Sequence, residues 1–438
     1  MMQVQRRGFA AAAVATIAFL MPVAAWAASP AQDVLRGWYD MALLLTRHTP
    51  TFSPPVASRA YGYIGVVAYE AVASGSTKLL PLAGQLNGLT AAPAREAGAA
   101  YDEAVVLDAA MAGVMGALFS NTGPTGHRAM EALEAKLRAE ITEGLAPEII
   151  ARSAGYGEAL ARHVIAWSEG DGGAVVTNMG FPLHYTPKPG PQYWVPTSTI
   201  AQQQAPLLPG WGGNRPFAMP EGASCATPAP PAYSEDKTSE YYRQAQEIDD
   251  FARHMTPEMR AIARFWADDA MLSVTPPGHW LSIALSVIDR EGLPLDRSVD
   301  ALLRLGVVEA DAFIGCWQTK FTYNTVRPVT YIRKVIDPGF ETLVTTPPFP
   351  EFPSGHSTLS AASAAVLTSL FGDGHAFTDD TDQADGLAPR PFPSFNAAAD
   401  EAGISRMYAG IHYRAAVELG AAQGRCIAAY AIALRTWK

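Results

Sequence analysis

Apolar residues recur at three- and four-residue steps along most of this chain, and alanine is frequent among them. This spacing places apolar side chains on one face of an α-helix, and alanine has the highest intrinsic helix propensity. We find no stretch that alternates apolar and polar residues as a half-buried strand does. The pattern predicts an all-α fold, with helices over residues 58–74, 100–119, 132–145, 147–170, 239–255, 257–272, 277–292, 297–323 and 409–437 and one more that begins at Gly355.

An irregular segment over residues 178–233 interrupts this helical pattern. It is rich in Pro, Gly and Gln, with Tyr185, Tyr193, Trp194 and Trp211 interspersed. So long a segment without helical periodicity is uncommon inside a compact domain, and it usually has a functional role or marks a boundary. We therefore expect three parts in the mature chain: an N-terminal helical part over residues 28–177, a covering segment over residues 178–233 and a second helical bundle over residues 234–438.

The first 27 residues have the features of an export signal. Arg6 and Arg7 precede an apolar run, and residues 25–27 form a small-x-small cleavage pattern. The arginine pair predicts a twin-arginine signal over residues 1–27; a general secretory signal and a membrane anchor are the alternatives. No later stretch offers about 18 uninterrupted apolar residues. We therefore expect a periplasmic or secreted protein without stable membrane insertion.

The composition is typical of a globular enzyme. Of the 438 residues, 49% are hydrophobic and 17% are charged, which is enough apolar surface for one large or two moderate cores. The formal net charge is −10 at pH 7. No basic stripe is present that could neutralise the phosphates of a nucleic acid, so a nucleic-acid partner is not expected.

Three cysteines allow at most one disulfide: Cys225, Cys316 and Cys426. Cys316 and Cys426 lie in apolar helical contexts, where a free thiol is usually a small buried hydrophobic group. We predict that these two cysteines are buried free thiols rather than metal ligands or nucleophiles.

The candidate chemistry lies in three short segments: KFTYNTVRP at residues 320–328, PSGH at residues 353–356 and SRMYAGIH at residues 405–412. The PSGH segment alone would indicate only a turn and a helix start. Together, the segments bring several cations and two histidines into one chain region. The cations would repel a metal cation, so the pattern predicts a site for an oxyanion.

The residue types in these segments suit an oxyanion. Lys320, Arg327 and Arg406 supply three cations, and guanidinium groups match the geometry of tetrahedral oxyanions. Ser354 and Gly355 begin an alanine-rich helix, whose free N–H groups and positive dipole end would point at an anion. Two histidines complete the set, His356 and His412.

The order of these residues resembles a known signature: Lys, six residues, Arg-Pro, then PSGH, then Ser-Arg, five residues, His. Vanadium-dependent haloperoxidases share it with type 2 phosphatidic acid phosphatases and bacterial class A acid phosphatases. The resemblance implies an all-helical fold and a vanadate cofactor, with His412 as the axial vanadium ligand. It also implies that the vanadate oxygens are held by Lys320, Arg327, Ser354, Gly355 and Arg406.

The resemblance leaves more than one activity open. In a haloperoxidase, hydrogen peroxide oxidises a halide to hypohalous acid, with His356 as the acid or base and Lys320 drawing charge from the peroxide. In a phosphatase, His412 would attack a phosphomonoester and form a phosphohistidine, while His356 protonates the leaving alcohol. A third possibility is a non-catalytic protein that binds phosphate or vanadate.

Two aromatic residues favour the haloperoxidase. Trp317 precedes Lys320 by three residues, and Phe349 precedes His356 by seven. Both positions look like those of residues on the halide side of the fungal chloroperoxidases. The alternative is that both are ordinary buried aromatics.

Carboxylates near the site are harder to place. An Asp often follows the last histidine of this signature by four residues, but that position is Ala416 here, and Glu418 would lie on another helical face. We therefore expect His412 to contact a backbone carbonyl and to be a poorer nucleophile. Asp268 or Asp269 is expected to hold Arg406, unless both face solvent on an amphipathic helix.

The remaining histidines and acidic residues have simpler interpretations. His254 and His279 are expected to be structural histidines. The acidic stretch over residues 379–386 predicts a solvated loop, and calcium binding is the alternative, although the EF-hand spacing is absent.

Overall fold

The computed structural model describes residues 29–438, so the predicted export signal lies outside the described residues. The all-α prediction is confirmed. None of the described helices is long and apolar enough to cross a membrane. The helices are α1 Pro30–His48, α2 Pro54–Ala73, α3 Glu103–Leu118, α4 Pro124–Ile141, α5 Pro147–Glu169, α6 Glu240–Arg253, α7 Pro257–Phe265, α8 Thr275–Glu291, α9 Leu295–Tyr323, α10 Pro328–Val335, α11 Gly355–Phe371, α12 Phe395–Tyr408 and α13 Arg414–Ile432.

Proline and capping side chains set where many of these helices begin. Proline occupies the first turn of α1, α2, α4, α5, α7, α8 and α10, where its missing N–H has no helical partner to lose. Other helices begin after a side chain that accepts a hydrogen bond from the third helical N–H, as Asp102 does for α3 and Ser354 for α11.

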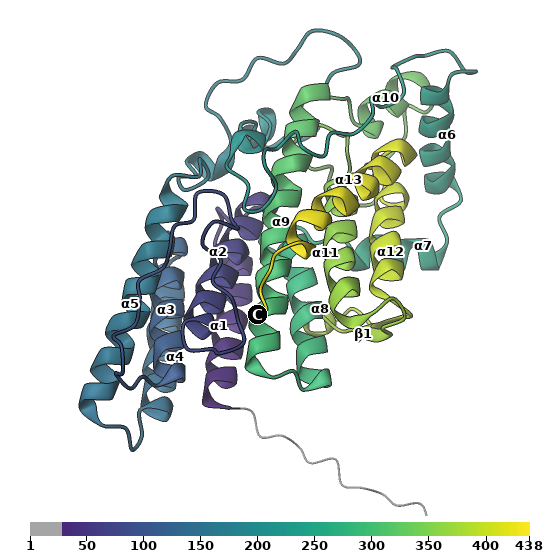
Figure 1. Ribbon diagram of the computed structural model, residues 1–438. Helices are drawn as coiled ribbons and strands as arrows, with labels where there is room; N and C mark the ends of the chain where they lie inside the picture. The colour runs from purple at the N-terminus through teal and green to yellow at the C-terminus, as the bar shows by residue number, and fades with distance from the viewer. Residues whose placement is uncertain (1–28) are drawn as a thin grey trace, which may run out of the picture.

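Helix α9 is the central element of the fold and is buried along most of its 29 residues. It packs against α2 and α8 and against α11 and α13. Figure 1 shows α1 to α5 on one side of α9 and α11 to α13 on the other. The crossing of α2 and α9 is close because Gly306 has no side chain; a Cβ there would lie 2.5 Å from Tyr61 O. One hydrophobic core therefore spans both helical groups.

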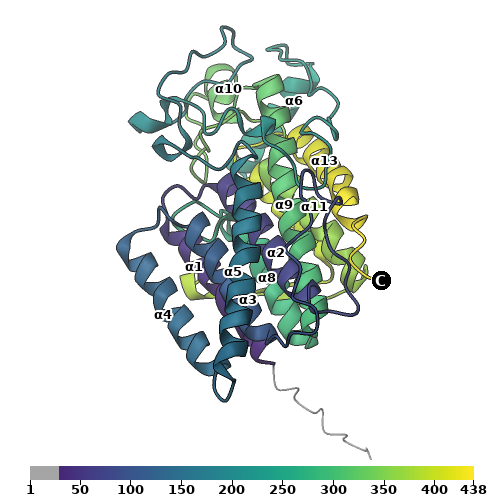
Figure 2. The same cartoon turned by 60° about the vertical axis from the view of Figure 1, so that its left-hand side comes forward.

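The irregular chain between α5 and α6 runs over one end of the helices, at the top of Figures 1 and 2. Asp311 of α9 anchors it by accepting the N–H groups of Phe217, Ala218 and Met219 at 2.6, 2.9 and 2.8 Å. Leu207 N–H donates to Pro348 O at 2.9 Å, so the same chain also contacts the loop before α11. Its regular structure is limited to three short 3₁₀ turns, Asn178–Gly180, Ala201–Gln204 and Trp211–Gly213.

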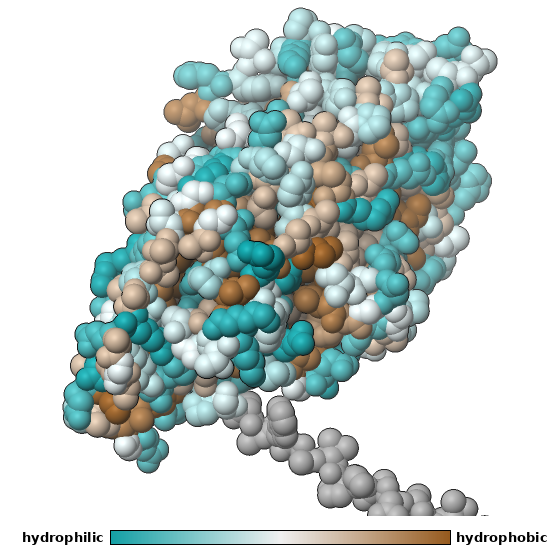
Figure 3. Space-filling model, viewed as in Figure 1, coloured by the Kyte–Doolittle hydropathy of each residue, from teal (hydrophilic) through white to brown (hydrophobic). Residues whose placement is uncertain are grey.

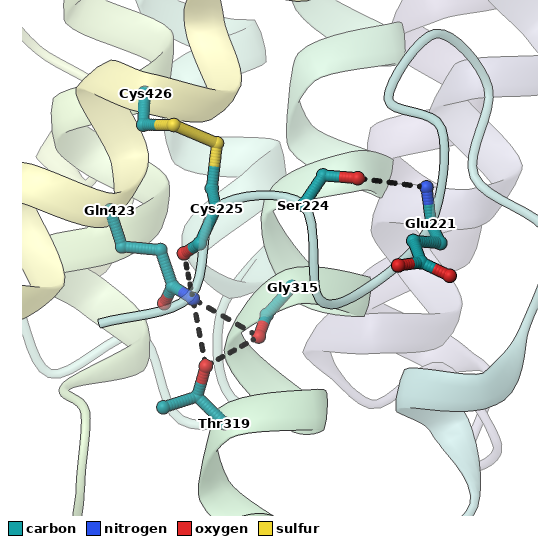
Figure 4. The surroundings of a disulfide bond; sticks show 7 residues. All are labelled: Glu221, Ser224, Cys225, Gly315, Thr319, Gln423 and Cys426. Atoms are coloured by element: carbon teal, nitrogen blue, oxygen red, sulfur yellow. Dashed lines mark hydrogen bonds between the residues drawn. A yellow bond between two sulfur atoms is a disulfide. The ribbon is translucent and has the colours of Figure 1, made fainter. Parts of the chain in front are cut away.

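A disulfide ties this irregular chain to α13. Cys225 and Cys426 are bonded across a sequence separation of 201 residues, and Gln423 donates to Cys225 O at 3.1 Å (Figure 4). The prediction of a free Cys426 is therefore wrong, while that of a buried free Cys316 is confirmed. Cys426 is also exposed rather than buried as predicted. Helical periodicity carries no information about which loop lies against it.

Two predicted helices are shorter than the apolar pattern suggested. The helix predicted over residues 257–272 ends at Phe265, and the helix predicted over residues 409–437 begins at Arg414. Asp268, Met271 and Thr275 have positive φ angles of 50°, 67° and 64°, which are incompatible with a continuous helix.

A small antiparallel sheet lies between α11 and α12. Its strands are β1 Phe377–Asp379 and β2 Arg390–Phe392, with a 3₁₀ turn at Gln383–Asp385 between them. Three-residue strands are too short to produce a detectable alternation, so the sequence pattern missed them.

The outer face drawn in Figure 3 mixes hydrophilic and hydrophobic residues.

Candidate active site

The structure brings the three motif segments together at one cavity of about 340 Å³. Its inner end is formed by Gly355 and His356 at the start of α11, by Arg406 in the last turn of α12 and by His412 in the loop before α13. Lys320 and Arg327 lie behind this end and are fully buried. Helix ends and loops thus position every residue of the predicted set.

The two arginines retain unpaired donors although they are buried. Arg327 Nε donates to Phe349 O at 2.8 Å and Nη1 donates to Ile411 O at 3.0 Å. Arg406 Nη1 donates to Trp266 O. Within the described part of the chain, Arg327 Nη2 and Arg406 Nε have no partner. Burial lowers the pKa of Arg327 to about 9 and that of Arg406 to about 10, so both remain cations at neutral pH.

The ammonium group of Lys320, which was predicted to bind the anion, already has backbone partners for all three of its hydrogen-bond donors. Its Nζ donates to Pro350 O at 2.9 Å, to Glu351 O at 3.0 Å and to Pro353 O. An ammonium group has three donors, so direct contact with a bound anion requires one carbonyl to be released. Burial lowers the pKa of Lys320 to about 7. Because backbone carbonyls occupy all three donors of Lys320, its positive charge acts on the cavity through its electrostatic field and not through a hydrogen bond.

The start of α11 is open toward the cavity. Ser354 Oγ accepts the N–H of Ser357 at 3.3 Å and caps the helix. A Cβ at Gly355 would meet no atom closer than 4.0 Å, and the atoms at that distance belong to Phe313 and Trp317 of the cavity wall. The absence of a side chain at Gly355 thus leaves room in front of the first-turn N–H groups, where an anion is favoured.

A buried carboxylate orients His412. His412 Nδ1 lies 3.1 Å from Glu351 Oε1, which also accepts the N–H of Tyr413 at 3.0 Å. His412 Nε2 lies 3.3 Å from Arg327 Nη1, an obligatory donor. These contacts place the ring proton on Nδ1 and leave a lone pair on Nε2. Burial, together with the charge of Arg327, lowers the pKa of His412 well below its usual value, so the ring is neutral.

The prediction that His412 contacts a backbone carbonyl is wrong, because its partner is the carboxylate of Glu351. His412 precedes α13, so the positions of Ala416 and Glu418 on that helix say nothing about its support. Glu418 is 63% exposed and faces Arg414. Burial raises the pKa of Glu351 to about 7. The signal that sequence reasoning missed was a carboxylate in the apolar run PPFPEFPSGH, where an unpaired charge would be costly.

Asp268 contacts the second histidine of the site. Its Oδ2 lies 3.6 Å from His356 Nε2, within ion-pair distance but beyond a hydrogen bond. Burial, with the charge of Arg406, lowers the pKa of His356 to about 4. The predicted ion pair between Arg406 and Asp268 or Asp269 is not found among the described residues. Both carboxylates affect the arginine only through their charge.

His279 links Asp268 to a second buried carboxylate. Its Nδ1 lies 2.9 Å from Asp268 Oδ1 and its Nε2 lies 2.8 Å from Asp379 Oδ2. Both ring nitrogens face carboxylates, so the ring carries two protons. Burial opposes that charge, but the two carboxylates raise the pKa of His279 well above its usual value. The charge of His279 in turn holds the pKa of Asp268 below its usual value, against the effect of burial.

The acidic stretch after α11 is only partly solvated. Asp379 is 2% exposed and Asp382 is 7% exposed, so the solvated-loop prediction is wrong for these two residues. Asp268, His279 and Asp382 lie close enough together to suggest a metal site. However, both nitrogens of His279 are taken by carboxylates, which leaves no lone pair for a cation. His279 is a satisfied histidine as predicted, and its partners connect it to the site.

Aromatic rings form one wall of the cavity. The ring centres of Trp317 and Phe349 lie 4.9 Å apart, and both rings line the cavity together with Phe313. Trp317 Nε1–H donates to Leu207 O at 3.2 Å, and Lys320 Nζ lies 5.1 Å from the centre of the Phe349 ring. The wall is therefore apolar at its surface and cationic behind it.

Comparisons with known proteins place these features in context. A family model described as the VCPO second helical-bundle domain matches residues 301–437. The crystal structure of the first bacterial vanadium-dependent iodoperoxidase matches with a TM-score of 0.84 and 35% identity, covering 93% of this chain and 97% of that one. No curated protein matches the chain.

Two further matches share the fold at lower identity. The apo-type bacterial vanadium-dependent chloroperoxidase has a TM-score of 0.64, and its match covers 87% of this chain and 93% of that one. The holo-type structure has a TM-score of 0.65, with 94% and 93% covered. Both are 16% identical to this chain.

The histidine environments predict opposite protonation states at the same pH. In protein labelled with nitrogen-15 histidine, we expect His279 to be doubly protonated at pH 7, because its two carboxylate partners raise its pKa well above the usual value. We expect His356 to remain neutral at pH 6, because its pKa is lowered to about 4. The ring nitrogen shifts report both states, and the variants His279→Gln and His356→Gln assign the signals. A neutral His279 at pH 7 would contradict the arrangement described.

Proposed function

This chain belongs to the vanadium-dependent haloperoxidases, and we propose that it binds vanadate and uses hydrogen peroxide to oxidise halide to hypohalous acid. One observation carries the proposal. Two buried guanidinium groups keep unpaired donors beside a cavity lined by the neutral His412, whose Nε2 lone pair lies 3.3 Å from Arg327 Nη1. An unpaired buried donor costs about 1–3 kcal/mol, and a bound oxyanion would remove that cost.

The residues present fit vanadate. Arg327 Nη2, Arg406 Nε and the first-turn N–H groups of α11 would hold its oxygens, with Ser354 at the helix cap and Lys320 contributing charge. His412 Nε2 would be the protein ligand to vanadium, since Glu351 keeps the ring proton on Nδ1. When bound, vanadate acts as a Lewis acid that makes hydrogen peroxide reactive toward halide without changing its own oxidation state.

His356 is proposed to move the proton of hydrogen peroxide. It lies at the inner end of the cavity, and its lowered pKa keeps the ring neutral near neutral pH, although it also makes the ring a weaker base than a free imidazole. Asp268 faces His356 Nε2 and would stabilise the imidazolium that forms. His279 and Asp379 hold Asp268 in its ionised form and in place, so these residues act as positioning residues for His356.

The aromatic wall is proposed to admit the halide. Trp317, Phe313 and Phe349 exclude water there, while the cations of Lys320 and Arg327 lie behind the Phe349 ring, 5.1 and 5.0 Å from its centre. A large, weakly hydrated anion suits such a surface. We propose iodide as the preferred halide, in line with the activity named for the bacterial iodoperoxidase.

One argument against the phosphatase alternative no longer holds, but other observations still disfavour it. Ala416 suggested that His412 lacks a supporting carboxylate, but Glu351 fills that role, so the position of Ala416 cannot exclude a phosphohistidine. The haloperoxidase activity is favoured over the phosphatase activity by family membership and by the apolar aromatic wall of the cavity.

We also propose that the chain is exported by the twin-arginine route. The support comes from Arg6 and Arg7, from the cleavage pattern at residues 25–27, and from the disulfide between Cys225 and Cys426. Stable disulfides are rare in reducing compartments.

Reconstitution tests the activity. Iodide oxidation should require added vanadate, phosphate should inhibit it by competing for the same cavity, and His412→Ala should lose vanadate retention. His356→Ala should lower kcat by about 100-fold or more, the usual size of an acid–base contribution. His254→Ala, at the exposed end of α6, serves as the control. Rapid hydrolysis of a phosphomonoester with no halide oxidation under saturating vanadate would reverse the assignment.

The role of Glu351 can be tested by equilibrium dialysis with vanadate. Glu351→Ala should raise the vanadate Kd by about 10–100-fold, the range typical when the partner of a metal-ligating histidine is removed. Glu351→Gln should have a smaller effect, because its amide oxygen can still accept from Nδ1. Glu418→Gln is the matched control on the exposed face of α13. Unchanged affinity in a folded Glu351→Ala protein would argue against the role.

Export can be tested by cell fractionation. The wild-type protein should be recovered outside the cytoplasm with its N-terminus at Ala28, and a variant with Arg6→Lys and Arg7→Lys should accumulate uncleaved inside. Unreduced mature protein should titrate one thiol in denaturant, since only Cys316 is free among the three cysteines. Correct export of the double lysine variant would favour the general secretory route.

A further inference from the structure

The cavity continues outward from the anion site as an apolar chamber. It is lined by Phe181 and Leu207 of the irregular chain and by Pro347 and Pro348 of the loop before α11. Three more apolar side chains lie at its solvent-exposed end: Met179, Met271 and Leu272. Four more polar residues also line the cavity, so the lining is mostly apolar with a few polar groups: Ser53, Gln203, Asp269 and Thr345.

The side chains at the outer end are exposed to an unusual degree. Met179 is 40%, Met271 50% and Leu272 68% exposed. Eight large hydrophobic residues of the described chain are exposed, and these three line the same cavity. Scattered exposed hydrophobic residues need no explanation, but a group around one concave site indicates an apolar ligand.

Backbone strain fixes the same side chains in place. Met179 and Met271 have φ angles of 56° and 67°, and Asp268, which also lines the cavity, has a φ angle of 50°. Non-glycine residues adopt this conformation rarely and only where the surroundings impose it, often at ligand sites. The apolar rim is therefore built into two separate segments of the fold.

Hydrogen peroxide and halide do not account for this chamber. Both are much smaller than the chamber, and the wall of Trp317, Phe313 and Phe349 already provides the proposed halide position, so the apolar lining beyond that wall is not needed to bind them. We propose that the chamber binds a neutral aromatic acceptor, such as a phenol, so that halogenation takes place beside the anion site. This inference rests on the proposed haloperoxidase activity and adds the class of its organic substrate.

The chemistry and size are consistent with such an acceptor. The cavity of about 340 Å³ is at the lower end of the range for small-molecule sites. An aromatic carbon donates an electron pair to the halogen of hypohalous acid; the carbon–halogen bond forms and the halogen–oxygen bond breaks. The departing hydroxide takes the ring proton and becomes water. The oxidising equivalent comes from hydrogen peroxide through the proposed activity.

Competition between two phenols tests the proposal. Vanadate-loaded enzyme is supplied with hydrogen peroxide, iodide and an equimolar mixture of thymol, which is apolar, and tyrosine, which is zwitterionic. The ratio of iodinated products is compared with the ratio produced by reagent hypoiodous acid. We expect the enzyme to favour thymol by about tenfold over the reagent, the scale of discrimination that apolar pockets provide.

Variants locate the effect in the chamber. Leu272→Asp should move the product ratio toward that of the reagent while triiodide formation without a phenol stays unchanged, and Met271→Asp provides a second test. Leu183→Asp is the control: Leu183 is 81% exposed, lies in the irregular chain between α5 and α6, and does not line the cavity. An unchanged ratio in both cavity variants would overturn the proposal.

A binding measurement separates this inference from the activity itself. Equilibrium dialysis of thymol against vanadate-free protein needs no catalysis, and saturable binding that Leu272→Asp weakens would support the chamber even if no halide were oxidised. Absence of triiodide formation would count against the proposed function alone. A wild-type product ratio equal to that of the reagent, with no saturable thymol binding, would mean that hypohalous acid leaves before it reacts.

Discussion

The burial of three cations around one cavity is the constraint on which the structure of this protein depends. Lys320, Arg327 and Arg406 are at most 1% exposed, and removing an ion from water costs several kcal/mol even after the protein relaxes. Backbone carbonyls satisfy Lys320 completely and the two arginines in part. Arg327 Nη2 and Arg406 Nε have no partner in the described part of the chain, so a bound oxyanion would supply the missing acceptor and the missing negative charge.

The carboxylates near the site are placed behind the histidines rather than on the arginines. Glu351 contacts His412, and Asp268 faces His356. A carboxylate paired directly with Arg327 or Arg406 would occupy the donors that an oxyanion needs. In the observed arrangement the negative charges still offset the buried cations at longer range, while each one orients a histidine. The two histidines of the site thus have separate carboxylate partners.

The rest of the fold keeps this charged centre dry. Helix α2 packs on α9 through a close glycine contact, and the irregular chain from α5 to α6 is held over the cavity by Asp311 and by the disulfide. Excluding water strengthens each electrostatic interaction in the site, because the local dielectric constant falls. The segments without helical structure therefore contribute as much to the chemistry as the helices that carry the motifs.

The sequence by itself determined the helical class, the motif residues and the anion chemistry, because apolar periodicity and residue type are local properties. It correctly placed Cys316 in the core and identified His279 as a satisfied histidine. Contacts between residues distant in sequence were decided only by the tertiary structure. Glu351 reaches His412 across 61 positions, and Asp379 reaches His279 across 100. The sequence pattern also extended the helix after Pro257 too far, since apolar residues continue into a loop whose positive φ angles are imposed by packing around the cavity. Local patterns specify which side chains must be buried, but the partners that make their burial possible depend on how the helices and the irregular chain assemble.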